Sequence, residues 1–376
     1  MKFTASAKEL KEALNKVANA TQSKATIPIL SHILFEITNN FLTLKSSKLD
    51  IFVSADIPVE SSDQFSFCAP KLVVDIVNRL QDTNYLDLEL QDDQIKISDS
   101  ISEFTLPILS ADSFPVFPKI NSSSGHLNFN FEFLKFIKDY LLFACSDKNY
   151  YHPAQTGVHL KYDGELIKFS ATDGYRLVHI KSEPRIFDLN SSETFEIIIP
   201  HKTIELATKI FKDEIISLYI ENNKILFINN LTFSNIIKLY SNLIDEKYPN
   251  IESIIPENPV ATLYFNREKL LNGFKQIKLI QDKNFARTHC FFDNSTLYLE
   301  SEGLEGKAKI KIDGEFEGEP FEFYISSEYM IDSLSHFPND FVKVNLFSPT
   351  KAILLEPNQK LNYDILHLIM PMKPND

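Results

Sequence analysis

Hydrophobic and polar positions follow one another along this chain in a pattern that returns six times. Each repeat is a short alternating segment, then apolar residues at helical spacing, then three further alternating segments. The first helix is predicted over 8–20, with Leu10, Ala13, Leu14 and Val17 on its apolar face. A period of roughly 60 residues indicates a chain assembled from similar supersecondary units.

The helical spacing and the alternation together predict six helices and a larger set of strands. The predicted helices are 8–20, 70–80, 131–143, 201–211, 267–281 and 328–337, the second opened by Pro70 with Val73, Ile76, Val77 and Leu80 inward. The predicted strands are 3–4, 29–38, 41–49, 51–59, 65–67, 85–90, 94–98, 102–108, 127–130, 157–162, 165–170, 176–181, 194–199, 215–221, 224–229, 232–239, 261–265, 289–292, 296–300, 307–312, 321–325, 341–347, 352–356 and 362–370.

The six modules pair most simply into three domains of two modules, predicted at 1–121, 126–253 and 260–376. The joints agree, because 122–125 is a flexible Ser-Ser-Ser-Gly linker and 256–259 is a stiffer Pro-Glu-Asn-Pro linker. Each domain would place two helices on antiparallel sheet. The expected fold class is therefore α+β with three similar domains.

Composition is that of an ordinary globular protein of 376 residues, with 44% hydrophobic and 24% charged residues. No apolar run is long enough to span a bilayer and no leader pattern opens the chain, so we expect a cytoplasmic protein without a membrane partner. Cys68, Cys145 and Cys290 have neither disulfide-framework nor zinc-site spacing, and we expect buried thiols.

The net charge of −13 argues against a protein that grips phosphates over its whole surface. Cations nevertheless fall on the polar faces of the first five predicted helices, whereas the sixth carries Glu328 and Asp332 and no lysine. Helices lining one cavity would make its wall basic, and binding would be independent of base sequence. The helical cations are Lys8, Lys11, Arg79, Lys135, Lys138, Lys202, Lys209, Lys275 and Lys278.

The stretch 170–177 is a compact polar turn between two predicted strands. Its Asp173-Gly174 pair tolerates a left-handed backbone, and Tyr175 and Arg176 would project from the far side. An ordinary surface hairpin fits these residues. A binding role gains weight from the closing segment 369–373, because two Met around a Pro make an adaptable apolar surface that suits peptides.

Motifs for catalysis are absent from the sequence, and only 9 glycines leave little room for a dinucleotide loop. Asp173, His179, His152 and Cys145 could be arranged as a nucleophile and base, but their spacing does not require it. His289-Cys290 is interpreted as a strand-borne core pair rather than a metal site. We expect no catalytic residues, no metal and no cofactor.

Several fragments in chain order resemble one family. They are Met1-Lys2-Phe3, Ile27-Pro28-Ile29-Leu30, Ala171-Thr172-Asp173-Gly174-Tyr175-Arg176-Leu177, Tyr248-Pro249 with Ile255-Pro256, and Met370-Pro371-Met372. Together they resemble the bacterial DNA polymerase III β subunits, the β sliding clamps. The resemblance implies the DNA clamp fold, with three domains per subunit, and a homodimer closed head to tail into a ring around duplex DNA. It also implies a non-catalytic processivity factor in DNA replication.

The resemblance assigns three groups of site residues. A pocket for short Gln- and Leu/Phe-containing peptides of the polymerase III catalytic subunit, clamp-loader complex, other polymerases and repair proteins would comprise Thr172, Gly174, Tyr175, Arg176, Leu177, Pro249, Ile254, Tyr329, Leu368, Met370, Pro371, Met372 and Lys373. The family suggests DNA contacts from Lys24, Asn149, Tyr150 and Tyr151, and the charge pattern of the helices adds Lys202 and Lys209. The dimer interface would join Phe104 and Leu106 to Leu279 and Ile280.

Two positions depart from the family pattern. Tyr175 stands where relatives commonly have His, and Gln155 stands where they often have an apolar residue. The pocket floor is therefore expected to be more polar. The alternative functions are a cytosolic hydrolase using Asp173 and a histidine, and an interaction scaffold that does not bind DNA.

Overall fold

The structure is a computed structural model that describes residues 1–22, 26–80, 84–120, 126–149, 151–187, 194–212, 215–229, 235–282, 287–293 and 295–373. The chain forms two compact units. Unit 1 contains Met1–Lys135, Phe187–Glu193 and Lys202–Leu243, and unit 2 contains Phe136–Ile186, Thr194–His201 and Ile244–Asp376. Each unit is built around its own antiparallel sheets.

Six α-helices occur in the described residues, each where apolar spacing predicts a helix. They are α1 (Ala7–Val17), α2 (Leu72–Arg79), α3 (Phe131–Leu141), α4 (His201–Ile210), α5 (Arg267–Lys278) and α6 (Ser327–Ser335). Short 3-10 turns are η1 (Ala18–Ala20), η2 (Pro28–Ser31), η3 (Ala111–Ser113), η4 (Leu142–Ala144), η5 (Pro153–Thr156), η6 (Pro184–Phe187) and η7 (Glu252–Ile254). None of the described helices is both long and apolar enough to cross a membrane.

The strands pair antiparallel in every ladder between the described strands. Those of unit 1 are β1 (Lys2–Ser6), β2 (His32–Thr38), β3 (Phe41–Lys48), β4 (Ile51–Ser61), β5 (Phe65–Pro70), β6 (Tyr85–Gln91), β7 (Gln94–Ser98), β8 (Glu103–Pro107), β9 (His126–Asn130), β14 (Ile215–Glu221), β15 (Lys224–Asn229) and β16 (Ile236–Asn242). Those of unit 2 are β10 (Gly157–Tyr162), β11 (Ile167–Thr172), β12 (Arg176–Ser182), β13 (Phe195–Pro200), β17 (Ala261–Asn266), β18 (Arg287–Asp293), β19 (Thr296–Gly303), β20 (Gly306–Asp313), β21 (Glu315–Gly318), β22 (Phe323–Ser326), β23 (Phe341–Leu346), β24 (Ile353–Pro357) and β25 (Tyr363–Ile369).

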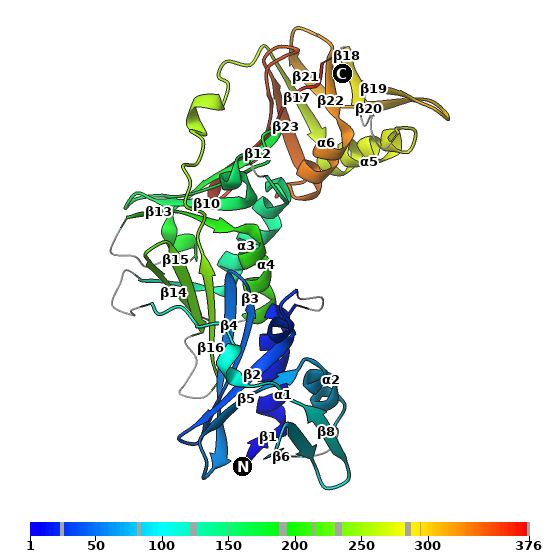
Figure 1. The fold of residues 1–376 in the computed structure, drawn as a ribbon. Coiled ribbons are helices and arrows are strands. Elements are labelled where there is room, and N and C mark those ends of the chain that lie inside the picture. Colours follow the sequence, from blue (N-terminus) through cyan, green and yellow to red (C-terminus); the bar gives the residue numbers. More distant parts are fainter. Residues whose placement is uncertain are drawn as a thin grey trace. The chain divides into compact units, whose positions relative to one another are not determined.

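The strands of unit 1 form one sheet in the order β8-β7-β6-β1-β4-β16-β15-β14-β9. Strand β3 also pairs with β4, β2 pairs with β3, and β5 pairs with β2. Helix α1 buries the four residues that the sequence predicts: Leu10, Ala13, Leu14 and Val17. It begins where the Ser6 side chain accepts a hydrogen bond from the Glu9 backbone N–H, as an N-cap should. Helices α1 and α2 pack together beside these strands (Figure 1).

Some predicted boundaries in unit 1 are wrong for local reasons. Helix α2 begins at Leu72 rather than at Pro70, because Pro70 ends β5 opposite His32 of β2. Its inward residues include Val74, and Leu80 is only half-buried because it is the C-cap.

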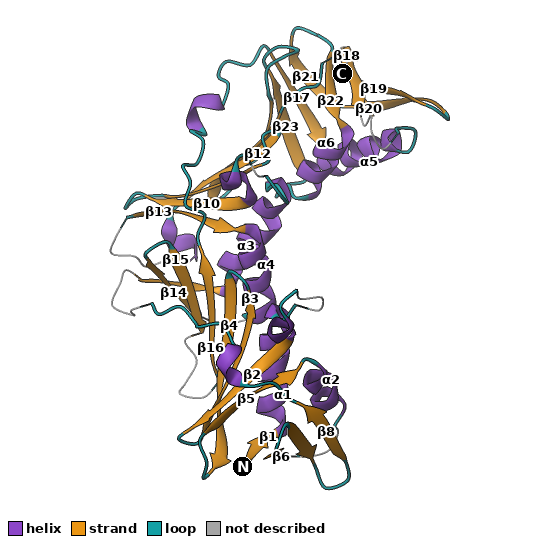
Figure 2. Ribbon diagram, in the orientation of Figure 1, coloured by secondary structure: helices purple, strands orange, loops and turns teal. Residues whose placement is uncertain are grey.

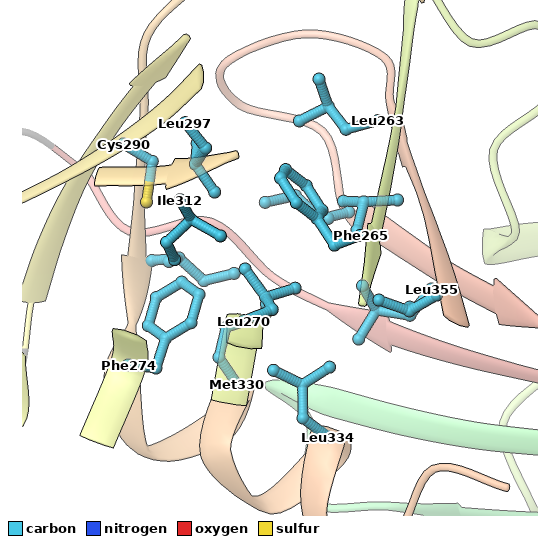
Figure 3. Close-up of a cluster of buried hydrophobic side chains, with 14 of the residues drawn as sticks. Leu263, Phe265, Leu270, Phe274, Cys290, Leu297, Ile312, Met330, Leu334 and Leu355 are labelled. Carbon is cyan, nitrogen blue, oxygen red and sulfur yellow. The ribbon is translucent and has the colours of Figure 1, made fainter. Parts of the chain in front are cut away.

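Unit 2 holds a nine-stranded sheet, β13-β10-β11-β12-β25-β24-β23-β17-β21, and a four-stranded sheet, β20-β19-β18-β22. Helices α5 and α6 lie together against these strands (Figure 2). Figure 3 shows the resulting core, in which Phe274 of α5 lies beside Ile312 of β20 and Leu334 of α6 lies near Leu355 of β24. The short strand β21 was not predicted, since its sequence is acidic rather than alternating with apolar residues.

The sheets run across both joints predicted between domains. In unit 1 the ladder of β4 with β16 pairs Ile51–Asp56 with Ile236–Ser241, and in unit 2 β12 pairs with β25. The predicted boundaries at 121–126 and 253–260 therefore remain a prediction. The α+β class is confirmed, because antiparallel sheets carry the helices in both units.

His367 of β25 is a buried imidazole in the core of unit 2. It lies between the Phe143 and Phe337 rings, with centroid separations of 5.6 and 5.3 Å. Neither ring nitrogen has a hydrogen-bond partner among the described residues. Burial, aided by His336, lowers the pKa of His367 from 6.5 to about 3. The folded state therefore holds a neutral ring where the unfolded chain would bind a proton.

The free energy of unfolding should consequently fall as the pH drops from 6.5 toward 3, because in that window only the unfolded chain protonates this histidine. The loss attributable to His367 is about 1.4 kcal/mol per pH unit. Urea unfolding of His367→Leu at pH 7, 6 and 5 should give a correspondingly flatter dependence. Exposed His152→Leu serves as the control and should leave the slope unchanged. If the free energy of unfolding depends on pH equally in His367→Leu and in the parent chain, His367 does not contribute to that pH dependence.

Candidate functional site

The loop between β11 and β12 has its shape fixed by its own side chains. The Asp173 carboxylate accepts hydrogen bonds from the backbone N–H groups of Tyr175 (2.9 Å) and Arg176 (3.0 Å). The Thr172 hydroxyl accepts from the Gly174 N–H (3.0 Å) and donates to the Arg176 carbonyl (2.6 Å). Gly174 has φ of +93°, which disfavours any side chain. The predicted Asp-Gly hairpin is confirmed.

The Arg176 side chain packs against the protein rather than projecting, and only 13% of it is exposed. Its guanidinium donates to Asp173 Oδ2 (3.0 Å) and, through Nη1, to Asp332 Oδ2 of α6. It also stacks between aromatic rings, 4.8 Å from the Tyr329 centroid and 5.5 Å from that of Phe143. Two carboxylates and two rings compensate its desolvation, so Arg176 ties the loop to α6.

The closing segment of the chain lies directly against this loop. In the β12–β25 ladder Arg176 is opposite Ile369 and Leu177 is opposite Leu368. The Met370 N–H then donates to the Tyr175 carbonyl at 2.8 Å. Two fragments almost 200 residues apart in sequence thus form one continuous surface.

The last described residues are anchored to the four-stranded sheet of unit 2. The Met372 N–H donates to the Tyr324 carbonyl of β22 at 2.8 Å, and Arg287 of β18 donates to the Lys373 carbonyl at 3.0 Å. Pro371, between them, is half-buried. The Met-Pro-Met segment is therefore held as an extended rim rather than left as a loose tail.

An apolar cluster lies beneath this rim. Its buried members come from η5, β12, β13, β24, β25, the connection between β23 and β24, and the connection that leads into η7. They are Ala154, Leu177, Ile198, Tyr248, Ile251, Phe347, Ala352, Leu354 and Leu368. Exposed apolar side chains lie in the same segments, namely Tyr175 after β11, Ile254 in η7 and Met370 after β25. Pro249 is exposed beside buried Tyr248.

Tyr329 of α6 joins the loop to the helix. Its ring stacks on Tyr175, with centroids 6.1 Å apart and planes inclined by 20°. Burial raises the pKa of Tyr329, as do the charges of Asp173 and other neighbours, so its hydroxyl stays neutral. The structure thereby brings Thr172, Gly174, Tyr175, Arg176 and Tyr329 together.

Gln155 packs on Gly174, where an added Cβ would lie 3.5 Å from the Gln155 side-chain nitrogen. Its Oε1 accepts a hydrogen bond from Asn149 at 2.8 Å. The Asn149 oxygen in turn accepts from the backbone N–H groups of Tyr151 and His152. Asn149 therefore has a structural role in its loop, in addition to the DNA contact that the sequence predicts.

The other predicted DNA contacts belong partly to unit 1 and partly to unit 2. Lys24 and Tyr150 lie outside the described residues. Tyr151 is 91% exposed, and Lys202 and Lys209 are exposed on α4. Their exposure leaves them available to a ligand.

The predicted dimer residues lie on an edge strand of unit 1 and at the end of helix α5 of unit 2. In unit 1, Phe104 and Leu106 belong to β8, an edge strand; Phe104 is 39% exposed and Leu106 is buried against its own sheet. In unit 2, Leu279 is the C-cap of α5 and is 83% exposed, and half-buried Ile280 follows it.

Two of the residues considered for catalysis have other hydrogen-bond partners. Asp173 is bound to Arg176, and the Nδ1 of His179 lies 2.8 Å from the Ser170 hydroxyl. The His289-Cys290 pair is not a core pair as predicted, because Cys290 points into the core while His289 lies on the opposite face beside Glu322. Strand alternation explains this difference. The described residues contain no cluster of three potential metal ligands.

The three cysteines form no disulfide with one another, and the expected burial is confirmed for two of them. Cys68 and Cys290 are buried, and Cys145 is half-buried. Burial raises the pKa of the Cys68 thiol to about 12 and raises that of Cys290 as well. Neither thiol is therefore poised as a nucleophile.

Sequence reasoning missed Asp332 and Phe143, which hold Arg176. The one available signal was that the sixth helix carries acidic residues where the other helices carry lysines. Tyr248 was quoted only as part of a motif, yet it is buried, and its hydroxyl donates to the Ser170 carbonyl at 3.3 Å.

Comparisons with known proteins cover almost the whole chain. Family models for the DNA polymerase III beta subunit match in order: the N-terminal domain over 1–118, the central domain over 132–250 and the C-terminal domain over 252–373. The beta sliding clamp of Streptococcus pneumoniae is 27% identical over 387 residues, covering 97% of each chain. The crystal structure of the DNA polymerase sliding clamp from Bacillus subtilis has a TM-score of 0.88 at 25% identity, covering 99% of each chain. That of the DNA polymerase III beta chain from S. pneumoniae has a TM-score of 0.90 at 26% identity, also covering 99% of each.

Removing the Asp173 carboxylate should loosen the loop. Asp173→Ala deletes acceptors for two backbone N–H groups and one partner of buried Arg176, so we expect unit 2 to lose about 1–3 kcal/mol of stability, measured by urea unfolding. Asp245→Ala, at an exposed position in the same unit, should change stability by less than about 0.5 kcal/mol. Equal stabilities of the two variants would contradict the role of Asp173.

Proposed function

Because this chain belongs to the DNA polymerase III beta subunit family, the sliding clamps, and acts as a DNA polymerase processivity factor, we propose that two copies close head to tail into a ring around duplex DNA. The ring would hold the polymerase to its template by a topological link, and the chemistry would belong to its partners. The clamp domains would be 1–121, 126–253 and 260–376, and the protein would act in the cytoplasm.

Two free sheet edges support the proposed dimer. Strand β8 ends the large sheet of unit 1, and β20 ends the four-stranded sheet of unit 2. Edge strands present unpaired N–H and C=O groups, and two different edges that pair give a head-to-tail contact that closes into a ring. Leu279 lies near the β20 edge, because Ile280 is so close to Gly303 at the end of β19 that a Cβ there would clash with the Ile280 carbonyl. We therefore place Phe104 of one subunit against Leu279 of the other, with Leu106 and Ile280 supporting them.

Charge supports a loose hold on DNA. The chain carries a net charge of −13, yet Lys202 and Lys209 are exposed on α4, and Lys275 on α5. Scattered lysines attract phosphates without base readout, and their contribution weakens with salt. Lys24, Asn149, Tyr150 and Tyr151 are proposed to add contacts from loops. A protein that slides needs such weak contacts, since tight phosphate binding would add friction.

One observation carries the proposed peptide pocket: the loop after β11 and the segment after β25 meet over the apolar cluster around Leu177 and Leu368. Exposed Tyr175, Ile254 and Met370 would surround that apolar floor, and such a patch suits short apolar peptide segments. We propose that the polymerase III catalytic subunit, the clamp-loader complex, other polymerases and repair proteins dock here through Gln- and Leu/Phe-containing segments. The pocket would comprise Thr172, Gly174, Tyr175, Arg176, Leu177, Pro249, Ile254, Tyr329, Leu368, Met370, Pro371, Met372 and Lys373.

The ring is tested by topology. Light scattering should give the mass of two subunits, and the clamp, once loaded on circular DNA, should stay bound until the circle is linearised and then leave within minutes. A negative charge on the β8 edge should prevent pairing with the second subunit. The Phe104→Asp chain should therefore be monomeric, and it should not be retained on circular DNA.

The control for this test is Val116→Asp, at a position 88% exposed outside the strands, which should remain dimeric and retained. Retention that continues after linearisation would contradict the topological link. If the Phe104→Asp chain is dimeric, the assignment of Phe104 to the interface is wrong, but the proposal of a ring still stands.

The pocket is tested by shortening the chain. Deleting 370–376 removes the exposed Met370 side chain and the Met372 contact with β22 while β25 stays complete, so binding of a Gln- and Leu/Phe-containing peptide should fall at least about tenfold. Fluorescence anisotropy with a labelled peptide measures this, and light scattering should still show a dimer. Deleting only 374–376 should leave affinity unchanged. Equal affinity in both truncated chains would refute the pocket assignment.

A further inference from the structure

A hollow of about 350 Å³ opens on the nine-stranded sheet of unit 2, beyond the proposed peptide pocket. Strands β10, β11, β12 and β13 form its floor, and the connection 247–252 forms its wall. Tyr248 ties the wall to the floor, because its ring stacks on His159 at 4.5 Å and its hydroxyl donates to the Ser170 carbonyl. The hollow is thus built from fixed elements.

His179 lines this hollow with a polar atom that has no partner. Its side chain is 4% exposed, and its Nδ1 is 2.8 Å from the Ser170 hydroxyl. Its Nε2 is buried and makes no hydrogen bond to any described residue. An unpaired buried polar atom is unfavourable and is normally matched by a ligand or water. His179 also borders a second hollow of about 450 Å³ toward β24 and β25.

Burial lowers the pKa of His179 to about 4, so its ring is neutral near pH 7. When the Ser170 hydroxyl donates to Nδ1, Nε2 carries the ring hydrogen and is a donor. A partner in the hollow would then supply an acceptor.

Charges around the hollow favour an anionic acceptor. Its lining includes three lysines, Lys161, Lys168 and Lys247, and two glutamates. Both glutamates are already paired: Glu196 with Lys161 (2.9 Å) and His159 (2.9 Å), and Glu252 with Lys168 (3.2 Å) and with Lys181 (3.3 Å) beyond the hollow.

Lys247 is exposed and forms no salt bridge to a described residue. It is therefore the cation of this hollow that remains available. A positive local balance in a chain of net charge −13 selects for negative groups.

The hollow continues the proposed peptide pocket along the same sheet face. Leu177 and His179 are two residues apart on β12, so their side chains point to the same side about 7 Å apart. Their neighbours on β25 are Leu368 and Leu366. Passing along β12 from the Met370 rim, a bound segment would meet first the apolar floor at Leu177 and then His179.

We propose that this hollow receives a carboxylate of the docked partner peptide, from an acidic residue flanking its apolar anchor on the side away from Met370. The inference rests on the proposed peptide-binding function and adds to it a second, polar specificity element. The carboxylate would accept a hydrogen bond from His179 Nε2 and pair with Lys247. Peptides with the same apolar anchor would then be ranked by their flanking charge.

The test compares flanking charge on a fixed anchor. A labelled Gln- and Leu/Phe-containing peptide is prepared with two Asp or two Asn residues on either flank, and affinity for the full chain is measured by fluorescence anisotropy. On one of the two flanks, the peptide with Asp residues should bind about fivefold more tightly than the peptide with Asn residues. That gain should fall below about twofold in Lys247→Met. It should also fall in His179→Asn, where the Asn amide replaces Nδ1 but not Nε2.

The matched control is Lys360→Met, because Lys360 is an exposed lysine bordering only the second hollow. It should preserve the fivefold gain. Equal affinities of the Asp and Asn peptides on both flanks, with the parent peptide still binding, would overturn this inference alone. A gain lost equally in Lys360→Met would overturn the placement of the carboxylate. Failure of the parent peptide to bind would overturn the peptide-binding function itself.

Discussion

The antiparallel ladder between β12 and β25 is the interaction on which the functional surface of unit 2 depends. It pairs Arg176–Ser182 with Tyr363–Ile369 over seven registered positions. That register sets Leu177 beside Leu368 to form the apolar floor, and it sets His179 beside Leu366 at the edge of the hollow. A slip of one residue would turn these side chains to the other face of the sheet. The peptide pocket and its proposed polar extension therefore share one structural cause.

Arg176 shows how a charged residue can be structural at a binding site. Its guanidinium is buried between two rings and two carboxylates, one from its own loop and one from α6. Removing either carboxylate would leave a buried cation only partly compensated. The acidic character of α6, which differs from the lysine-bearing helices, is explained in part by this contact. Tyr175 remains exposed because Arg176 fixes the loop beneath it.

The proposed activities use weak interactions in distinct places. Under this proposal, exposed helical lysines would attract phosphates diffusely, edge strands β8 and β20 would pair with a second subunit, and the apolar floor would bury part of a peptide. None of these requires a catalytic group, and the buried thiols and paired carboxylates of the described residues fit that absence of chemistry. The acidic remainder of the chain would limit non-specific adhesion to DNA.

Local patterns in the sequence determined much of this protein. Apolar spacing is a property of consecutive residues, so all six helices and most strands were predicted from it. The turn at Asp173-Gly174 was predicted from that residue pair alone. The family resemblance, which rests on short fragments, pointed to the function that the comparisons confirmed. The edge strand β21, the start of α2 and the outward position of His289 were not predicted, because pairing rather than composition decided them.

Only the tertiary structure decided which side chains meet. Asp332 lies 156 residues from Arg176 in sequence, and no local pattern marks it as the partner of a buried cation. His179 reads in the sequence as one alternating strand residue. The wall at 247–252 nevertheless encloses a hollow beside it, in which its Nε2 has no hydrogen-bond partner among the described residues. Such contacts are set by strand register and by packing between distant segments, whose free energies depend on the whole fold rather than on neighbouring residues.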